Sequence, residues 1–276
     1  MIIDAFLFFD ELDVLEIRLH ELDPVVDRFL IVDALETFGS RRRKPSVLRE
    51  NWSLVEEFQH KITHVTLERL EPAYDGTNSW PREHFQRNAI LGHALRIASS
   101  PNDVLMLSDC DEIPRASAVA EAIPAVGMAR FQQDLFYYNV NCYIGSWDQG
   151  TVIGTIPQFQ QAGGTQAARC GQFRVVPNGG WHFSYFGDIK KMRLKVESFA
   201  HSGDSFCRDF LARSDREVAR EVAANAGIFD GKGPYPRRET DDERLPQYLR
   251  SNPERFRKFT LDYFLEQNQD LLRDER

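Results

Sequence analysis

Short, largely apolar runs separated by helical patterns limit the fold of this chain more than any other feature. The runs cover residues 2–9, 28–32, 62–67 and 104–107. Residues 12–22 and 80–98 instead repeat apolar side chains at the spacing of amphipathic helices. Apolar strands without alternation are typical of a parallel sheet that helices cover on both faces. The pattern predicts an α/β fold with a Rossmann-like, mixed but mainly parallel sheet.

The pattern changes after residue 114, where turns become frequent. We expect strands over 131–144, 151–156, 172–176 and 182–186 with no full helix between them, and helices over 190–199 and 205–224. A polar loop over 231–246 then precedes a C-terminal helix over 253–272. We therefore expect a single domain over 1–276, with a first half (1–114), a second half (115–230) and a final loop and helix (231–276).

Composition and charge exclude several classes of protein. With 34 Lys+Arg against 42 Asp+Glu, the net charge is −8, which argues against a non-specific partner of nucleic acid. No apolar run approaches the roughly 18–20 residues of a transmembrane helix. The four cysteines form no CxxC pair, and no signal peptide is apparent. These observations predict a cytoplasmic protein, either free or peripheral at a membrane, and leave its oligomeric state open.

Acidic side chains follow the predicted strands. Asp10-Glu11 and Asp33 end the first two, and Asp109 and Asp111 end the fourth. Carboxyl ends of parallel strands meet at one sheet edge, where ligands bind, so we expect these groups to converge. Two carboxylates one residue apart can share Mg²⁺ or Mn²⁺ and leave coordination positions open for phosphate oxygens. The alternative is a turn whose acidic residues cap the next helix.

The helix before this D-x-D motif carries Arg87 and Asn88, which we expect near the same sheet edge. The guanidinium of Arg87 could hold the base or the diphosphate of a nucleotide. The alternative is that Arg87 pairs with Glu83, four residues earlier, on a solvated helix face.

An R-N dipeptide on a helix, followed by a buried strand that ends in D-x-D, is similar to the donor-binding half of GT-A glycosyltransferases. Several segments in order resemble glycosyltransferase family 17 more closely. They are FLFFDELDVLEIRLHEL (6–22), NDVLMLSDCDEIP (102–114), GGWHFSYF (179–186) and SFAHSGD (198–204), with weaker agreement in FDG (229–231) and LPQYLRSNPERF (245–256). The resemblance implies a GT-A-like fold and an inverting transfer of N-acetylglucosamine from a UDP donor to a saccharide or glycoconjugate acceptor, assisted by Mn²⁺ or Mg²⁺.

On this interpretation the first half binds the nucleotide sugar and the second half holds the acceptor. Metal ligands are expected at Asp109, Asp111, His182 and His201, although each histidine could equally be structural. Donor contacts are expected from Phe9, Asp10, Asp33, Arg87, Asn88, Asp109 and Trp181. The base that takes the acceptor proton is the least defined role. Asp204 and Glu112 are preferred, Asp188 and Glu197 are also available, and Asp204 could instead be a helix N-cap.

Other features keep two interpretations. Trp181, Tyr185 and Phe186 could stack on a sugar or pack in the core. The basic runs 41–44 and 190–195 could bind phosphates or lie in solvent, and 231–246 could close over the donor or be a plain connection.

Two other functions remain open. One is a catalytically inert nucleotide-sugar or carbohydrate binder on the same fold. The other is a phosphatase of the haloacid-dehalogenase type, in which the first Asp of D-x-D is the nucleophile and Asp241-Asp242 form a second acidic pair.

Overall fold

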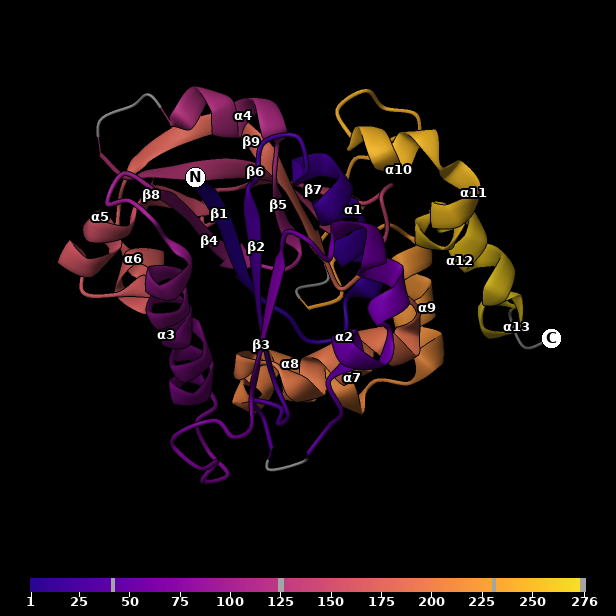
Figure 1. Cartoon of the computed structure of the whole chain (residues 1–276). Helices are drawn as coiled ribbons and strands as arrows, with labels where there is room; N and C mark the ends of the chain where they lie inside the picture. Colours follow the sequence, from indigo (N-terminus) through magenta and orange to yellow (C-terminus); the bar gives the residue numbers. More distant parts are fainter. Residues whose placement is uncertain (41–42, 124–126, 230–231, 274–276) are drawn as a thin grey trace.

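The computed structural model describes residues 1–276 except 41–42, 124–126, 230–231 and 274–276. Within these residues one mixed sheet holds nine strands in the order β3-β2-β1-β4-β8-β6-β9-β5, with β7 paired to β6 (Figure 1). The strands are β1 (Ile2–Leu7), β2 (Arg28–Ala34), β3 (Ile62–Leu67), β4 (Val104–Asp109), β5 (Glu112–Pro114), β6 (Ala129–Tyr137), β7 (Tyr143–Trp147), β8 (Val152–Thr155) and β9 (Arg174–Ser184). The prediction of a mixed α/β fold is confirmed.

The first four strands of the chain are parallel, as predicted. In register, Leu7 of β1 lies beside Val32 of β2 and Asp109 of β4, so these three strands end at one level. The connections are helical: α1 (Leu12–Leu22) follows β1, and α3 (Trp80–Ile97) leads into β4. Two short elements, α2 (Val47–Glu50) and the 3-10 helix η1 (Trp52–Phe58), precede β3 and were not predicted.

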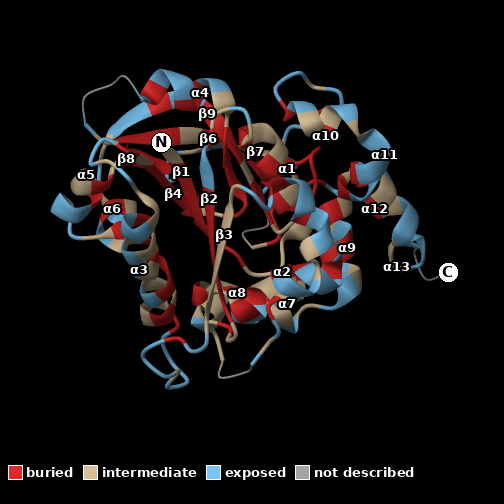
Figure 2. Cartoon of the chain, in the orientation of Figure 1, coloured by how far each residue is buried: buried red, intermediate tan, exposed pale blue. Residues whose placement is uncertain are grey.

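Helices cover both faces of the sheet, which explains the continuous apolar runs. Phe6 of β1 packs in a cluster with Leu15 and Leu19 of α1, while the neighbouring Ala5 packs in a second cluster with Ile90 of α3. Each strand therefore needs apolar side chains on both sides, and burying one Leu or Phe contributes about 1.5–3 kcal/mol. Figure 2 shows the central strands buried and the outer helix surfaces exposed.

The second half differs from its prediction in three places. The expected strand over 131–144 is a β6–β7 hairpin, and the two expected over 172–176 and 182–186 are the single strand β9. Asn178 and Gly180, with φ of 52° and 143°, carry β9 through the turn-like PNGG segment that suggested a break. Short helices α5 (Ile156–Gln161) and α6 (Thr165–Cys170) also separate β8 from β9, and α4 (Ala116–Ala122) follows β5.

After β9 the chain is helical, as predicted, but in shorter pieces on either side of the predicted loop over 231–246, whose described residues 232–246 hold no helix. The pieces are α7 (Ile189–Ser198), η2 (Ala200–Gly203), α8 (Ser205–Ala212), α9 (Asp215–Ala223), α10 (Gln247–Ser251), α11 (Pro253–Phe256), η3 (Arg257–Phe259), α12 (Leu261–Gln267) and α13 (Gln269–Leu272). The helix expected over 205–224 is divided because Ser214 and Glu217 form a capping box that starts α9. The last helices flank α1 in Figure 1, and the His20 ring of α1 stacks on Tyr248 at 3.6 Å. Within the described ranges, no helix is both long and apolar enough to cross a membrane.

Candidate functional site

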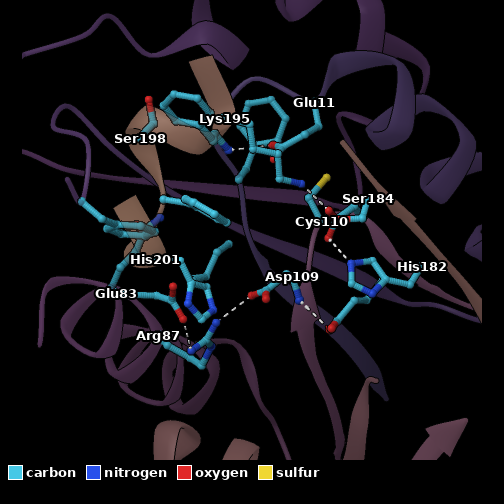
Figure 3. A pocket seen from close by; sticks show the side chains of 18 of the residues that line it. Glu11, Glu83, Arg87, Asp109, Cys110, His182, Ser184, Lys195, Ser198 and His201 are labelled. Carbon is cyan, nitrogen blue, oxygen red and sulfur yellow. Dashed lines mark hydrogen bonds and ion pairs between the residues drawn. The ribbon is translucent and has the colours of Figure 1, made fainter. Parts of the chain in front are cut away.

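A cavity of about 450 Å³ lies where β1, β2 and β4 end. Its first-half lining includes Phe9, Glu11, Lys44, Trp80, Arg87, Asp109, Asp111 and Glu112. The second half contributes Tyr137, Trp147, Arg169 and Tyr185. It also contributes His182, Lys195 and His201, which are labelled in Figure 3. The topology thus brings the D-x-D motif of β4 against side chains that follow it by up to about ninety residues in the chain.

A buried arginine shapes the D-x-D turn. Arg18 of α1 is fully buried and donates to both carboxylate oxygens of Asp4, at 2.7 and 2.6 Å. Its remaining donors reach the carbonyl oxygens of Asp109, Cys110 and Glu112 at 3.0, 3.2 and 2.9 Å. One guanidinium therefore fixes the backbone of the whole turn, while the Asp4 carboxylate compensates its charge.

Asp109 is held by two guanidinium groups. Its Oδ1 accepts a hydrogen bond from Arg87 at 2.8 Å, and its Oδ2 lies 3.6 Å from Arg169 of α6. Burial alone would raise the pKa of Asp109, but the two arginines outweigh it and lower that pKa. Arg87 also pairs with Glu83 at 2.7 Å, as the alternative predicted, but this pair is largely buried at the cavity and does not lie on a solvated helix face.

Asp111 has different partners. Lys195 Nζ of α7 lies 2.5 Å from its Oδ2, and His182 Nε2 of β9 lies 3.6 Å from its Oδ1. Burial would raise the pKa of this carboxyl, but Lys195 and His182 hold it well below its ordinary value. Asp111 is therefore an ionised, buried carboxylate at neutral pH.

Glu112, a preferred base, is fully engaged. Its Oε1 accepts from Arg169 at 2.5 Å and from the Trp147 indole at 3.1 Å, and its Oε2 accepts from the Asp109 amide at 3.2 Å. Its side chain is only 1% exposed. A general base needs an accessible lone pair, so the geometry favours a positioning role for Glu112 over the predicted base role.

Asp204 and His201 form a pair at the rim. His201 Nδ1 lies 2.6 Å from Asp204 Oδ2, and the edge of the ring contacts Trp80 at a centroid distance of 4.4 Å. His201 lines the cavity, whereas Asp204 does not. In Figure 3, His201 and His182 lie on opposite sides of Asp109. Among the described residues no group of three metal-ligating side chains converges, so the two histidines do not complete one shared metal site.

Four predicted donor contacts do not line the cavity, and three of these four are held elsewhere by local partners. Asp33 is fully buried between Ser46, at 2.5 Å, and His64, at 3.2 Å. Asn88 points outward and accepts from the Gln166 amide. Trp181 is 1% exposed, under the guanidinium of Arg115, and donates to the Arg244 carbonyl. For each of these residues, local partners replace the expected role, and the structure corrects the expectation that their side chains meet the D-x-D motif.

The other sequence candidates are distributed as follows. Phe9 lines the cavity beneath Lys44, and Asp10 borders a smaller neighbouring pocket. Tyr185 lines both hollows, whereas Phe186 borders only the smaller one. Asp188 caps α7, and Glu197 is exposed on that helix.

The loop and basic-run candidates meet the cavity only in part. Asp242 is bound by Arg238 and Arg244 outside the cavity. Arg41, Arg42 and Gly231 lie outside the described residues, so their predicted roles stay predictions.

Sequence reasoning missed several residues of the site. Arg18 carries a usable signal, because it interrupts the apolar face of α1, where a charge needs a buried partner. Trp147 and Arg169 carry none, since each follows short-range patterns typical of a turn or a surface helix. Lys195 belongs to the basic run 190–195, and the sequence does not distinguish it from the other basic residues there. Only the orientation of α7 shows that Lys195 is the one that reaches the site.

Known proteins similar to this chain point to one family. A family model described as "Glycosyltransferase family 17" matches residues 1–261. Two similar proteins named beta-1,4-mannosyl-glycoprotein 4-beta-N-acetylglucosaminyltransferase come from Mus musculus and Homo sapiens. Both are 27% identical, over 93% and 89% of this chain, and 54% and 52% of their own length. The chain therefore spans about half the length of these curated relatives.

Two solved structures show a weaker likeness. They are the inositol-1-phosphate CTP transferase from T. maritima (TM-score 0.32, 13% identity, 63% of this chain and 84% of that one) and M. tuberculosis glucosyl-3-phosphoglycerate synthase (0.37, 9%, 72% and 80%). Both scores are below 0.5, and neither structure bears on the activity. The family match, by contrast, covers nearly the whole chain and confirms the resemblance seen in its motifs. The chain belongs to glycosyltransferase family 17.

Proposed function

We propose that this protein transfers N-acetylglucosamine, with inversion, from a UDP donor to a hydroxyl of a saccharide or glycoconjugate acceptor. The observation that carries the proposal is that the D-x-D pair, Asp109 and Asp111, lines the same cavity as Trp80 and Trp147. The relatives' names supply the sugar and the acceptor class. The first half would bind the donor, and the second half would face the acceptor.

The charge of the cavity supports a divalent cation in this reaction. Among its described lining residues, six carboxylates outnumber four cationic side chains; they are Glu11, Glu36, Glu83, Asp109, Asp111 and Glu112 against Lys44, Arg87, Arg169 and Lys195. Arg82, which pairs with Glu36 at 2.8 Å behind the lining, reduces this excess of negative charge to one, and a diphosphate would add further negative charge to it. A donor that arrives with Mg²⁺ or Mn²⁺ removes this penalty, so the charge balance favours metal-dependent binding.

The residues present fit such an ion when the donor supplies further ligands. Asp111 and His182 place an oxygen and a nitrogen 3.6 Å apart, and Asp109 lies two residues before Asp111 on the same turn. Mg²⁺ is commonly held by one or two carboxylates together with substrate phosphates. When bound, the ion would supply charge neutralisation to the leaving diphosphate. Arg87 and Arg169 would hold the Asp109 carboxylate in place, so Asp111 would be the direct carboxylate ligand.

The proton of the acceptor hydroxyl is best received by the His201–Asp204 pair. Asp204 holds Nδ1 of His201, and Nε2 has no hydrogen-bond partner among the described residues. As the acceptor oxygen bonds to the anomeric carbon and the bond to the diphosphate breaks, Nε2 would take the proton. The Asp204 carboxylate would stabilise the resulting imidazolium. Asp204 thus keeps a part in base catalysis, through His201.

Trp147 is the better sugar platform than Trp181. Its ring lies 5.1 Å from the His182 ring at the cavity wall, and its indole nitrogen is anchored on Glu112. An anchored indole can present its face to the apolar face of a sugar ring.

A screen of nucleotide sugars tests the proposed function. We expect metal-dependent hydrolysis of UDP-N-acetylglucosamine above other donors, and calorimetric UDP binding that needs Mn²⁺ or Mg²⁺. UDP binding with equal affinity in EDTA would contradict the metal assignment. Binding without any turnover, with or without saccharide acceptors, would favour the inert binder instead.

An aryl phosphate in the same screen addresses the phosphatase alternative. We expect no cleavage, because both oxygens of Asp109 face arginines and are poorly placed to act as a nucleophile. Sustained release of phosphate from this substrate would contradict the proposal.

A further inference from the structure

We propose that Lys195 is a resident counter-ion of Asp111, which yields this carboxylate to the divalent cation that arrives with the donor. The inference rests on the proposed metal-dependent transfer. It adds a competition within the site, in which the same carboxylate serves the ammonium group when the donor is absent and the metal when it is present.

The ion pair is close and largely shielded from solvent. The Nζ–Oδ2 distance is 2.5 Å, and the side chains are 21% and 8% exposed. Helix α7 holds Lys195 firmly, since Asp188 caps its start and Met192 and Val196 are fully buried. Lys195 is thus built into the site and is more than a surface lysine that reaches it by chance.

Two cations cannot share Asp111 at low cost. An ammonium group already lies against Oδ2, and a divalent ion bound to the same carboxylate would face its like charge in a partly desolvated cavity. Metal binding therefore requires Lys195 to move away or to weaken its contact. The intact ion pair should lower the affinity of the empty site for metal.

A second carboxylate is ready to receive the ammonium group. Glu11 lines the same cavity, and its Oε2 accepts from the Phe9 and Asp10 amides at 3.0 and 3.1 Å. Its other oxygen has no hydrogen bond or ion pair among the described residues. Glu11 is also among the charges that act on Lys195. Lys195 can therefore exchange Asp111 for Glu11 without leaving the cavity.

The choice of lysine suits an exchange. Arg87, the partner of Asp109, is tied at once to Glu83 and Gln166 at 2.7 and 2.8 Å, which anchors its rigid fork. Lys195 carries a compact charge on a flexible stem, and its one short bond is to Asp111. Of the two aspartates, Asp111 is thus the one whose cation is easily displaced.

The test is Mn²⁺ binding to the nucleotide-free protein, measured by calorimetry or by the electron paramagnetic resonance signal of free Mn²⁺. Removing the ammonium group in Lys195→Met leaves Asp111 uncompensated, so we expect Mn²⁺ to bind about tenfold more tightly or better. Lys191→Met on the same helix changes the same charge outside the main cavity and controls for the overall field. Equal Mn²⁺ affinity in Lys195→Met and wild type would overturn the proposal.

Glu11→Gln provides an effect of opposite sign. The amide oxygen can still accept from the two backbone amides, but Lys195 loses its alternative partner, so Mn²⁺ should bind more weakly. In the Lys195→Met background this weakening should largely disappear. If the substitution weakens Mn²⁺ binding equally in both backgrounds, Glu11 acts only through its general charge, and the exchange is wrong.

These outcomes are separable from the proposed function. Metal-dependent UDP binding by the wild type can persist while Lys195→Met leaves Mn²⁺ affinity unchanged, in which case only the competition fails. Should Lys195→Met not fold, as judged by its thermal melt, Lys195→Gln removes the same charge and keeps a hydrogen-bond donor for Asp111. The same tightening is expected of it, and its absence would count equally against the proposal.

Discussion

The two halves of the molecule contribute opposite charges to the site. The first half supplies the acidic motif, Asp109 and Asp111, from the end of a buried strand. The second half supplies most of what compensates it: Arg169 from α6, His182 from β9 and Lys195 from α7. Arg87 is the exception, since it comes from the helix that leads into the motif. Strands therefore fix where the anions lie, and later helices decide how tightly each is held.

The comparison also separates the two aspartates. Asp109 is gripped by guanidinium groups that have other anchors, while Asp111 is paired with an ammonium group and an imidazole. The first arrangement suits a positioning role, and the second suits exchange with an incoming ion. Substitution of Asp111 should therefore lower turnover more than it lowers the stability of the fold.

The largest effect is expected for Asp111→Asn. Without this carboxylate the leaving diphosphate loses its cation, so transfer should fall about a thousandfold or more, equal to roughly 4 kcal/mol. Turnover of UDP-N-acetylglucosamine measures the loss of transfer, and the thermal melt measures whether the fold is retained. Asp209→Asn, which removes an exposed carboxylate from α8, is the matched control. Near-normal turnover by Asp111→Asn would remove this residue from the metal site.

Arg18→Met tests the support under the acidic motif. It leaves Asp4 buried without its partner and frees three carbonyl oxygens of the turn, so unfolding should become easier by roughly 3 kcal/mol or more. Urea unfolding gives this value. The double variant Arg18→Met/Asp4→Leu should recover part of the loss, because no unpaired charge is then buried. A loss below 1 kcal/mol in the single variant would contradict the role of Arg18.

The two tryptophans of the second half should separate binding from stability. Trp181→Leu opens space in the core and should cost about 2 kcal/mol or more of unfolding free energy. Trp147→Leu should cost about 1 kcal/mol, yet raise KM or lower turnover about tenfold if its ring holds the sugar. Urea unfolding and steady-state kinetics on both variants decide. The reverse assignment of effects would return the sugar platform to Trp181.

The smallest effect concerns the contact between α1 and α10, where His20 stacks on Tyr248. Burial lowers the pKa of His20 below its ordinary 6.5. As the pH falls, the unfolded chain therefore binds a proton at His20 before the folded protein does. The contribution of His20 to the free energy of unfolding is complete above the unfolded pKa and is lost as the pH falls below it. We expect under about 1 kcal/mol from this group between pH 7.5 and 5.5.

His20→Phe provides the matched control, since it keeps a ring to stack on Tyr248 but cannot titrate. Urea unfolding at the two pH values should show a smaller pH-dependent loss in this variant. An identical pH dependence in both proteins would exclude His20 as the source.

Parts of the fold and site could be predicted from local patterns. The parallel strands β1, β2 and β4 could be recognised because both their faces are largely apolar. The position of Asp109 and Asp111 at a strand end follows from chain direction alone. The hairpin β6–β7 and the continuous β9 were not, because PNGG has the local chemistry of a turn and becomes a strand only through its neighbours. Asp33 and Trp181 had suitable chemistry for the site, but local partners hold them away from the cavity.

The sequence by itself determined the family, the α/β fold of the first half and the acidic motif, because these depend on residue type and short-range periodicity. Only the tertiary structure decided which cation meets which carboxylate: Arg169 with Glu112, Lys195 with Asp111, and Asp204 with the cavity only through His201. Such pairings depend on the orientation of helices that are distant in the chain. A difference of one helical turn along α7 separates Lys195, beside Asp111, from Lys191, which borders only the smaller pocket.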